Sequence, residues 1–278
     1  MECKLENITV YYEVFGEGRP IIMLHGWSGS RRHMISDLEP VFAQHTGWQR
    51  IYLDMPGHGK TPGKDWINNQ DQMLEVVLDF IDHVIPGRNF SVAGVSAGAY
   101  LARGVVYKKL AMIEGVLLVV PLIVAEDAKR DLPPHVTLVK DPQLLAGLAQ
   151  DEAEMFQMCV VQNQRILDGL KAGFDPQSKE GDEQFQEKIR NNPANYAFSF
   201  DVDTIPGPCP APTLVIAGKQ DAVVGYRDAW KILDNYPRGS FALLDRAGHF
   251  LGLEQEDLFR ALTDEWLDRV EEYTGATK

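Results

Sequence analysis

The sequence predicts an α/β protein whose central sheet is mostly parallel and is covered by helices on both faces. Strand-like and helix-like segments alternate along the chain, as they do in βαβ units. Residues 116–120 and 213–217 are apolar almost without interruption, which indicates strands that are buried on both faces. The sheet is therefore expected to lie between two layers of helices.

The first third of the chain supplies the outer strands and two helices. Residues 8–15 alternate and are rich in β-branched and aromatic side chains, so they predict a strand that forms a hairpin with residues 20–24. Residues 32–44 are compatible with a polar helix, and residues 49–53 predict a short strand. An amphipathic helix follows, because apolar side chains recur at helical spacing between acidic ones: Met73, Val77, Phe80, Ile81 and Val84.

The remaining core elements follow the same logic. Residues 90–93 predict a strand that leads into a helix extending to Lys108, and residues 241–244 predict a late strand. A closing helix on one face of the sheet is indicated by four apolar side chains at helical spacing: Phe259, Leu262, Trp266 and Val270.

Between two of the buried strands the pattern changes. Residues 122–211 contain polar, helix-compatible segments without a convincing buried strand, and a cluster of prolines ends this stretch. We therefore expect three parts: a first core part over 1–121, an inserted helical cap over 122–211, and a second core part over 212–278.

Composition limits the class of protein. With 278 residues, 45% of them hydrophobic and 24% charged, the chain can bury a large core in one domain or in a domain with an insertion. The net charge of −13 argues against nucleic acid or an anionic membrane as a partner. No apolar stretch is long enough to cross a bilayer, and no signal peptide is visible. A small-molecule substrate is expected, and formation of a homo-oligomer is left open.

Cysteine usage points to a reducing compartment. Cys3, Cys159 and Cys209 are odd in number and lack the spacing of metal ligands. We expect free thiols in a cytoplasmic protein without membrane insertion. No motif indicates a metal ion or a cofactor.

The residues Gly94-Val95-Ser96-Ala97-Gly98 lie between a predicted strand and a predicted helix. A GxSxG at such a place predicts a sharp turn that exposes the serine hydroxyl above the sheet. Gly94 and Gly98 would remove collisions two residues to either side of the serine. The N–H of Ala97, at the start of the helix, would face the same spot as the hydroxyl. Ser96 is thus the candidate nucleophile.

A serine hydroxyl needs a base to take its proton and an acid to orient that base. Asp221 and His249 each follow a predicted strand of the second core part, so both would lie at the carboxyl edge of the sheet. Glu126 or Asp127, after the preceding core strand, could supply the acid instead. We favour Asp221 because of its place after a strand and its order in the chain.

The loop after the strand at 20–24 begins with His25-Gly26-Trp27. Its small residues would leave the backbone N–H of Trp27 free to face the sharp turn at Ser96, called the elbow below. Together with the N–H of Ala97 it would form an oxyanion hole, a hydrogen-bonding site for the negative charge that develops on a carbonyl oxygen.

Five motifs in this order resemble those of the α/β-hydrolase superfamily, in its capped branch. They are His25-Gly26, the turn at 54–61, the GxSxG elbow, Gly218 to Asp221, and Gly248 to Glu254, and the match extends from about residue 10 to residue 254. The resemblance implies the α/β-hydrolase fold with an inserted cap. It also implies a serine esterase with a triad of Ser96, Asp221 and His249 that works through an acyl-enzyme.

Some members of this fold depart from that expectation. Its relatives include hydrolases of carbon–carbon bonds, lactones and amides, and ligand receptors that turn over slowly. Ser96 excludes the haloalkane dehalogenase and epoxide hydrolase type, which needs aspartate there. Ala97 stands where proline-specific peptidases usually carry tryptophan, and no asparagine lies between Gly26 and Glu39, unlike in the dienoate hydrolases. The expected substrate is therefore a small to medium apolar ester.

Several further residues are candidates for the substrate pocket: His25, Ser28, Met155, Phe156, Cys159 and Phe250. The apolar cap residues among them could equally form the core of the cap, where methionine fills gaps. His25 and His58 fit a structural role in their turns better than the role of a base. Arg31 and Arg32 could bind a substrate carboxylate, although arginines in such places are usually solvated.

Overall fold

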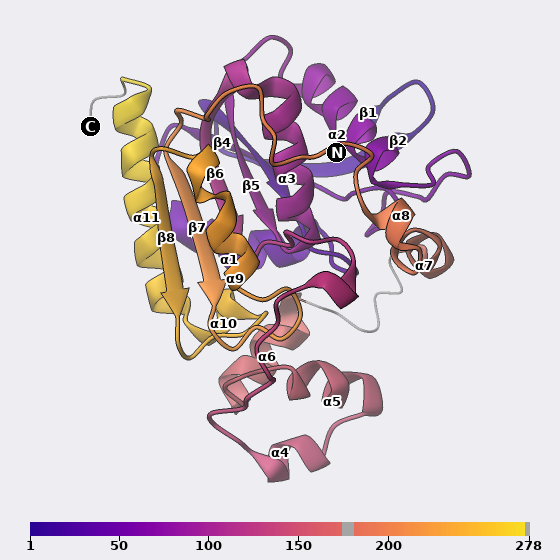
Figure 1. The fold of residues 1–278 in the computed structure, drawn as a ribbon, viewed down its shortest axis with the longest axis vertical. Coiled ribbons are helices and arrows are strands. Elements are labelled where there is room, and N and C mark those ends of the chain that lie inside the picture. Colours follow the sequence, from indigo (N-terminus) through magenta and orange to yellow (C-terminus); the bar gives the residue numbers. More distant parts are fainter. Residues whose placement is uncertain (174–180, 276–278) are drawn as a thin grey trace.

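Figure 1 shows the computed structural model, which describes residues 1–173 and 181–275. An eight-stranded sheet crosses its centre in the order β1-β2-β4-β3-β5-β6-β7-β8. The strands are β1 (Glu2–Lys4), β2 (Thr9–Phe15), β3 (Arg19–Leu24), β4 (Trp48–Leu53), β5 (Phe90–Val95), β6 (Ile113–Val119), β7 (Thr213–Gly218) and β8 (Gly239–Leu244). Strands β3 to β8 run parallel to one another, and β2 runs antiparallel to β1 and β4. The predicted α/β fold with a mostly parallel sheet is confirmed.

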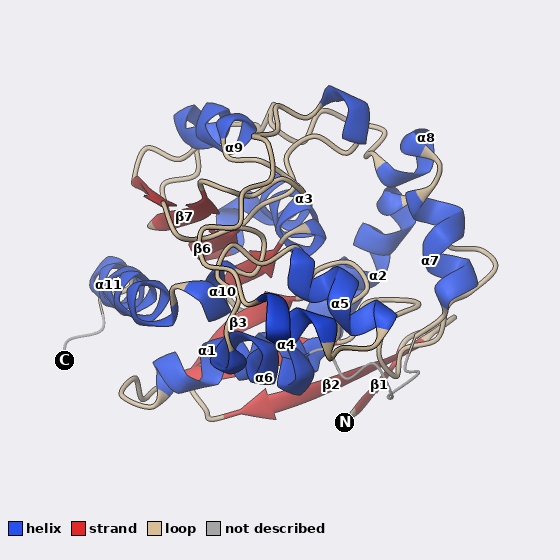
Figure 2. Ribbon diagram, turned by 90° about the horizontal axis from the view of Figure 1, so that it is seen from below, coloured by secondary structure: helices blue, strands red, loops and turns tan. Residues whose placement is uncertain are grey.

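Helices cover both faces of the sheet. Figure 2 shows α1 and α11 on one side of the strands and α2, α3 and α9 on the other. The helices are α1 (Arg31–Phe42), α2 (Gln70–Val84), α3 (Ala97–Lys109), α4 (Pro142–Ala146), α5 (Gln150–Gln157), α6 (Gln164–Gly173), α7 (Glu183–Arg190), α8 (Pro193–Tyr196), α9 (Arg227–Lys231), α10 (Leu251–Glu254) and α11 (Glu256–Tyr273). Three short 3₁₀ helices accompany them: η1 (Leu110–Met112), η2 (Asp127–Lys129) and η3 (Ile232–Asn235).

The predicted hairpin between residues 8–15 and 20–24 is wrong. Strand β2 pairs with β1 and β4, whereas β3 lies between β4 and β5. The reason is burial. The last five residues of β3 are all buried, which suits the interior of a parallel sheet, while β2 is mostly half-buried and suits a place near the edge.

The segment between β6 and β7 packs in two ways. Phe185, Ile189 and Tyr196 belong to the main hydrophobic core. Phe156 and six other buried residues form a second, smaller cluster to which α5 and α6 contribute. Figure 1 shows α4, α5 and α6 beyond the carboxyl ends of β7 and β8. The three-part division of the chain stays a prediction, since the arrangement alone does not show that the cap is independent.

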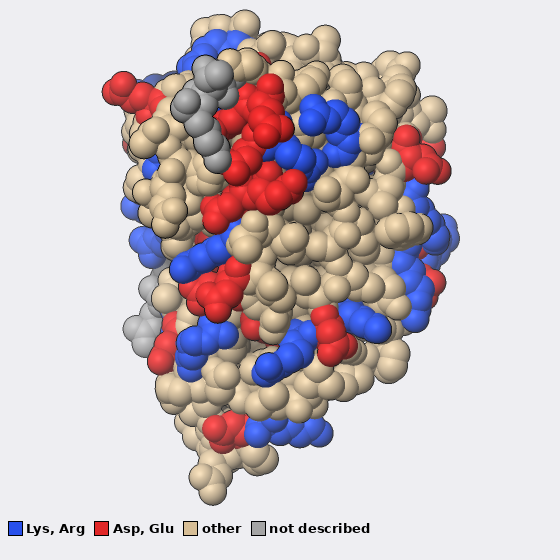
Figure 3. All heavy atoms as spheres, turned by 90° about the vertical axis from the view of Figure 1, so that its left-hand side faces the viewer, with Lys and Arg blue, Asp and Glu red and all other residues tan. Residues whose placement is uncertain are grey.

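The surface is strongly acidic in places. Figure 3 shows acidic side chains gathered on the face that α11 covers, and α11 begins with Glu256 and Asp257. Among the described residues, no helix combines the length and the apolar character needed to cross a membrane. Cys3, Cys159 and Cys209 are all buried and free.

Candidate active site

The turn at Ser96 joins β5 to α3 in an unusual backbone conformation. Ser96 has φ 55° and ψ −118°, a region that residues with a side chain rarely adopt. Its N–H donates to the carbonyl of Val119 at 3.0 Å, and its carbonyl accepts from the N–H of Leu122 at 3.1 Å. The end of β6 therefore holds the strained turn in place.

Gly94 and Gly98 allow this turn to approach its surroundings closely. A Cβ atom on Gly94 would lie 2.4 Å from the carbonyl oxygen of Gly98, and a Cβ atom on Gly98 would lie 2.1 Å from that of Leu24. Both collisions are with backbone atoms, which cannot move without displacing α3 or β3. The structure thus contains the crowding that the GxSxG spacing predicts.

Asp221 and His249 meet beyond the carboxyl ends of β7 and β8. His249 Nδ1 lies 3.0 Å from Asp221 Oδ2, and Asp221 is fully buried. The other carboxylate oxygen accepts the N–H groups of Val223 and Val224 at 2.8 and 3.1 Å. These contacts hold the Asp221 carboxylate in place. Because the carboxylate accepts a hydrogen bond from His249 Nδ1, the proton of the neutral imidazole lies on Nδ1, and Nε2 is able to accept a proton.

Glu126 and Asp127, the alternative acids, have other partners. Glu126 pairs with Lys129 at 2.7 Å, and Asp127 pairs with Arg130 at 2.5 Å. The side chain of Asp127 is 70% exposed, so it lacks the enclosure that would make a carboxylate orient an imidazole. The geometry favours Asp221 as the acid partner of His249.

The loop after β3 approaches the elbow from the opposite side. A Cβ atom on Gly26 would lie 3.4 Å from the Cβ of Ser96, and Ser28 has a positive φ of 59°. The N–H of Trp27 makes no hydrogen bond to any residue that the structure describes, and Ala97 is the first residue of α3, so its N–H has no acceptor within the helix. Both groups are available to a ligand.

His25 lies behind this loop rather than in the pocket. It is fully buried; Nδ1 donates to the carbonyl of Gly26 at 2.7 Å, and Nε2 accepts the N–H of Met55 at 3.0 Å. Burial lowers the pKa of His25 to about 4, so the ring is neutral near pH 7. The expectation that His25 lines the pocket is wrong, because both of its nitrogens are used to shape the loop.

The turn at 54–61 also has a structural task. The buried carboxylate of Asp54 accepts the backbone N–H groups of Arg31 and Lys60, each at 2.9 Å, and binds the guanidinium of Arg31. Arg31 also contacts Glu13 at 2.7 Å and is 6% exposed. Arg31 is therefore committed to this network and does not bind a substrate carboxylate.

Ser96 and His249 line one cavity of about 420 Å³. Among the other candidate residues, Trp27, Ser28, Met155 and Phe250 also line it. Phe156 and Cys159 do not; both are fully buried in the second hydrophobic cluster. The sequence leaves open whether these two residues line the pocket or form the core of the inserted segment, and the structure places them in that core.

Two acidic residues of the cavity wall, Asp151 and Glu154, are not among the candidates that the sequence indicates. Asp151, Glu154, Met155 and Met158 line the cavity together, and their spacing of three and four residues places them on one face of a helix. The helical spacing of Asp151 and Glu154 relative to Met155 is the signal in the sequence that could have identified both residues. Arg190, at the end of α7, also lines the cavity. The residues around it in the sequence form no motif that indicates this position.

Glu254 connects the segment between α5 and α6 to the loop that carries His249. One of its carboxylate oxygens accepts the N–H groups of Val160 and Val161, the latter at 3.2 Å, and the other accepts the N–H of Gly248 at 2.6 Å. Glu254 is 4% exposed, and burial raises its pKa. One buried carboxylate thus joins the two segments that bound the cavity.

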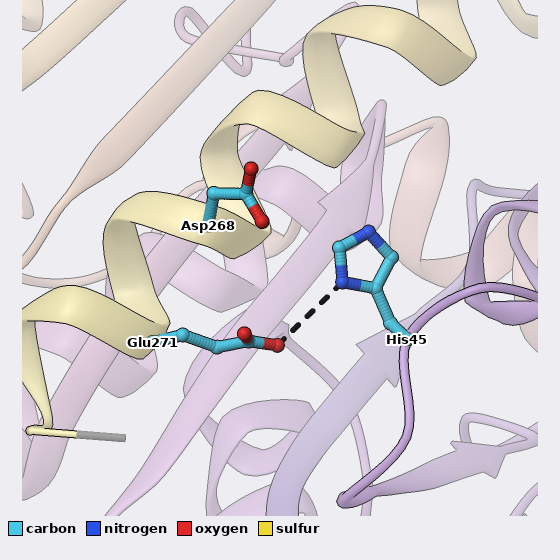
Figure 4. A group of neighbouring side chains, drawn as sticks. All are labelled: His45, Asp268 and Glu271. Carbon is cyan, nitrogen blue, oxygen red and sulfur yellow. Dashed lines mark ion pairs between the residues drawn. The ribbon is translucent and has the colours of Figure 1, made fainter. Parts of the chain in front are cut away.

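One group among the described residues could hold a metal ion: His45, Asp268 and Glu271 (Figure 4). His45 Nδ1 lies 3.5 Å from Glu271 Oε1, and Nε2 lies 3.2 Å from Asp264 Oδ1. Trp48 Nε1 donates to the same Glu271 oxygen at 2.8 Å. These contacts attach the loop before β4 to α11. The group lies at the amino end of β4, so it has no part in a site at the carboxyl ends of the strands.

A family model described as the alpha/beta hydrolase family matches residues 21–262. The chain belongs to this family. Its fold is shared closely by the crystal structure of an alpha/beta superfamily hydrolase from Oenococcus oeni, with 28% identity, coverage of 98% of this chain and 99% of that chain, and a TM-score of 0.86.

Characterised relatives of this hydrolase align along nearly its whole length. A 2-hydroxy-6-oxo-6-(2'-aminophenyl)hexa-2,4-dienoic acid hydrolase from Metapseudomonas resinovorans is 26% identical, over 96% of this chain and 90% of that protein. A pimeloyl-[acyl-carrier protein] methyl ester esterase from Legionella pneumophila (strain Corby) is 23% identical, over 94% and 100%. The protein is thus an enzyme of the hydrolase class, as its sequence motifs predict.

Proposed function

We propose that this hydrolase is a serine esterase that works through an acyl-enzyme. The observation that carries the proposal is the shared cavity of Ser96 and His249, with His249 held at 3.0 Å by the buried carboxylate of Asp221. An ordered nucleophile, base and acid at the carboxyl ends of three strands is the arrangement that acyl transfer requires.

Each residue then has a role in the reaction. His249 takes the proton of Ser96 through Nε2 while the hydroxyl oxygen attacks the ester carbonyl, and Asp221 stabilises the imidazolium that forms. The N–H groups of Trp27 and Ala97 bind the oxyanion, each worth about 3 kcal/mol of transition-state stabilisation. His249 next protonates the leaving alcohol. Water repeats the cycle and releases the acid.

The cavity supports a small to medium ester with an apolar part. Its walls include Trp27, Met155, Met158, Val223 and Phe250, and a volume of about 420 Å³ lies within the usual range for small-molecule sites. Residues 122–211 would close this cavity as a cap.

A second candidate substrate carries a carboxylate besides the bond that is cleaved. Arg190 lines the cavity and hydrogen-bonds the side chain of Tyr196; its guanidinium lies 5.6 Å from the centroid of the Tyr196 ring. An arginine in this place can bind a carboxylate. The dienoic acid hydrolase among the relatives, named for an acidic substrate, makes carbon–carbon hydrolysis of such an acid the alternative reaction.

Probe labelling and an ester panel test the proposal. We expect a fluorophosphonate probe to label the wild type but not Ser96→Ala, and nitrophenyl esters of short acids to be hydrolysed only by the wild type. Arg190→Gln should raise KM for a half-ester of a dicarboxylic acid and leave the matched neutral ester unchanged. If Ser96 resists the probe and a small molecule raises the melting temperature without turnover, the protein is a receptor and the esterase proposal fails.

The compartment is also a proposal. All three cysteines are buried and free of disulfides, which supports a reducing compartment such as the cytoplasm.

A further inference from the structure

A second cavity of about 360 Å³ adjoins the first at His249. The two cavities share Glu154, Met158, Val223 and His249, and the second adds His135, Gln157 and Ala222. Ser96 and Trp27 line the first cavity and not the second. The residues that the two cavities share therefore include the candidate base but not the candidate nucleophile.

The chemistry assigns different places to the two halves of an ester. The carbonyl must lie against Ser96 and the N–H groups of Trp27 and Ala97, which restricts it to the first cavity. As the C–O bond of the tetrahedral intermediate breaks, the electron pair goes to the alcohol oxygen and His249 gives that oxygen its proton, while the acyl group stays on Ser96 Oγ. The alcohol oxygen must therefore lie beside His249.

We propose that the second cavity binds the leaving alcohol of the substrate and selects alcohols that have an apolar body and carry no negative charge. This inference rests on the proposed esterase function and adds the class of leaving group to it. The alcohol oxygen lies at His249, and the remainder of the alcohol continues into the space that opens there. The acyl part stays in the first cavity, beside Met155 and Phe250.

The walls of the second cavity determine which alcohol fits. Ala222, Val223 and Met158 offer apolar surface, which favours an aromatic or branched alcohol over methanol. Glu154 carries a negative charge where the two cavities meet, and its Oε1 accepts a hydrogen bond from Gln150 Nε2 at 3.1 Å. An alcohol that carries its own negative charge would be repelled there.

A residue found in only one cavity makes the test specific. Gln157 lines the second cavity but not the first, and it is exposed, so Gln157→Trp can fill the second cavity without disturbing the core. Gln143→Trp is the matched control, since Gln143 is exposed, lies on the neighbouring helix α4 and lines neither cavity. The substrates are 1-naphthyl butyrate, methyl butyrate and methyl octanoate.

We expect Gln157→Trp to lower kcat/KM for 1-naphthyl butyrate about tenfold relative to wild type, while both methyl esters change less than about twofold. Gln143→Trp should leave the hydrolysis of all three esters unchanged. Ala222→Leu provides a second variant with the same expected pattern. Comparing each variant with wild type on the same ester removes differences in leaving-group reactivity.

A separate pair of esters tests the charge. Glu154→Gln should raise kcat/KM for 4-butyryloxybenzoate, whose leaving group is anionic, and leave phenyl butyrate unchanged. If kcat/KM for 4-butyryloxybenzoate is the same in Glu154→Gln as in wild type, the proposed selection by charge is wrong.

Other results would overturn the assignment of the cavity. Selective loss of methyl octanoate hydrolysis in Gln157→Trp would show that the second cavity holds the acyl chain. Equal effects on all three esters, or none, would show that it holds neither part. These outcomes differ from failure of the proposed function, in which wild type cleaves no ester or Ser96→Ala cleaves them equally well.

Discussion

The cavity has two sides that are built on different principles. On the core side, Ser96, Trp27 and His249 lie on loops directly after strands β5, β3 and β8. On the cap side, Met155, Met158 and Arg190 come from the helical segment between β6 and β7, part of which packs around a cluster of its own. The comparison suggests that the sheet sets the positions needed for chemistry, while packing of the helices sets the shape that a substrate meets.

Backbone strain follows the same division. The described part of the chain has three residues other than glycine with positive φ: Ser28, Ser96 and Val120. All three lie just after strands on the core side, and the N–H of Val120 donates to the carbonyl of Ile216 at 2.7 Å. Strained conformations persist where the surrounding structure holds them. The sheet can do this because its strands are hydrogen-bonded on both sides.

The largest effect is expected from the acid on the core side. Asp221→Asn should lower kcat about 10⁴-fold without changing KM greatly, because the asparagine favours the wrong tautomer of His249. Steady-state kinetics on a nitrophenyl ester would measure this. Glu126→Gln and Asp127→Asn are the matched controls and should stay near wild type; a large loss in either one would move the acid role away from Asp221.

The elbow glycine provides a comparison of stability. Gly98→Ala should lower the free energy of unfolding by about 3 kcal/mol or more, since the new methyl group would overlap the backbone of β3. Gly147→Ala, after α4, should have little effect, because its Cβ would meet no atom closer than 3.6 Å. Urea titration of both variants tests this. Equal stabilities would mean that the core side is not the more tightly constrained one.

Acid should weaken the core side through His25. Its pKa is lowered by burial to about 4, so the folded state keeps it neutral where the unfolded state takes up a proton. Above pH 6.5 the ring is neutral in both states and the free energy of unfolding is unaffected. As the pH falls from 6.5 toward 4, protonation of His25 in the unfolded state alone lowers the free energy of unfolding. Between pH 7 and pH 5 the loss is about 2 kcal/mol. Urea titrations at the two pH values should show a smaller difference for His25→Asn, but an unchanged one for the exposed His83→Asn.

The connection between the two sides can be tested at Glu254. Glu254→Gln should lower kcat about tenfold, because its amide group cannot accept hydrogen bonds at both ends, and either the cap or the His249 loop loses its partner. Asp228→Asn is the control: it removes another buried carboxylate that accepts a backbone N–H, that of Asp131. If both variants lose stability equally and neither loses kcat, Glu254 has only a structural role.

Much of the core side could be predicted because its signals are local. The GxSxG spacing reports a steric conflict between residues four apart, and Asp221 and His249 follow apolar runs that end at one edge of the sheet. The cap side could not be predicted in the same way. Phe156 and Cys159 are as apolar as Met155 and Met158, and only the packing of residues 155–159 decides that the first two belong to the cluster and the other two line the cavity.

The α/β fold, the sharp turn at Ser96 and the places of Asp221 and His249 after their strands could be predicted from the sequence, because each depends on short-range sterics or on a period that the chain repeats. The tertiary structure decided that β2 pairs with β1 and β4, that His25 is committed to the loop, and that Arg190 lines the cavity. It also decided that Glu254 joins the cap to the His249 loop. These features depend on segments far apart in the chain, whose contacts form only when the sheet and the helices are packed.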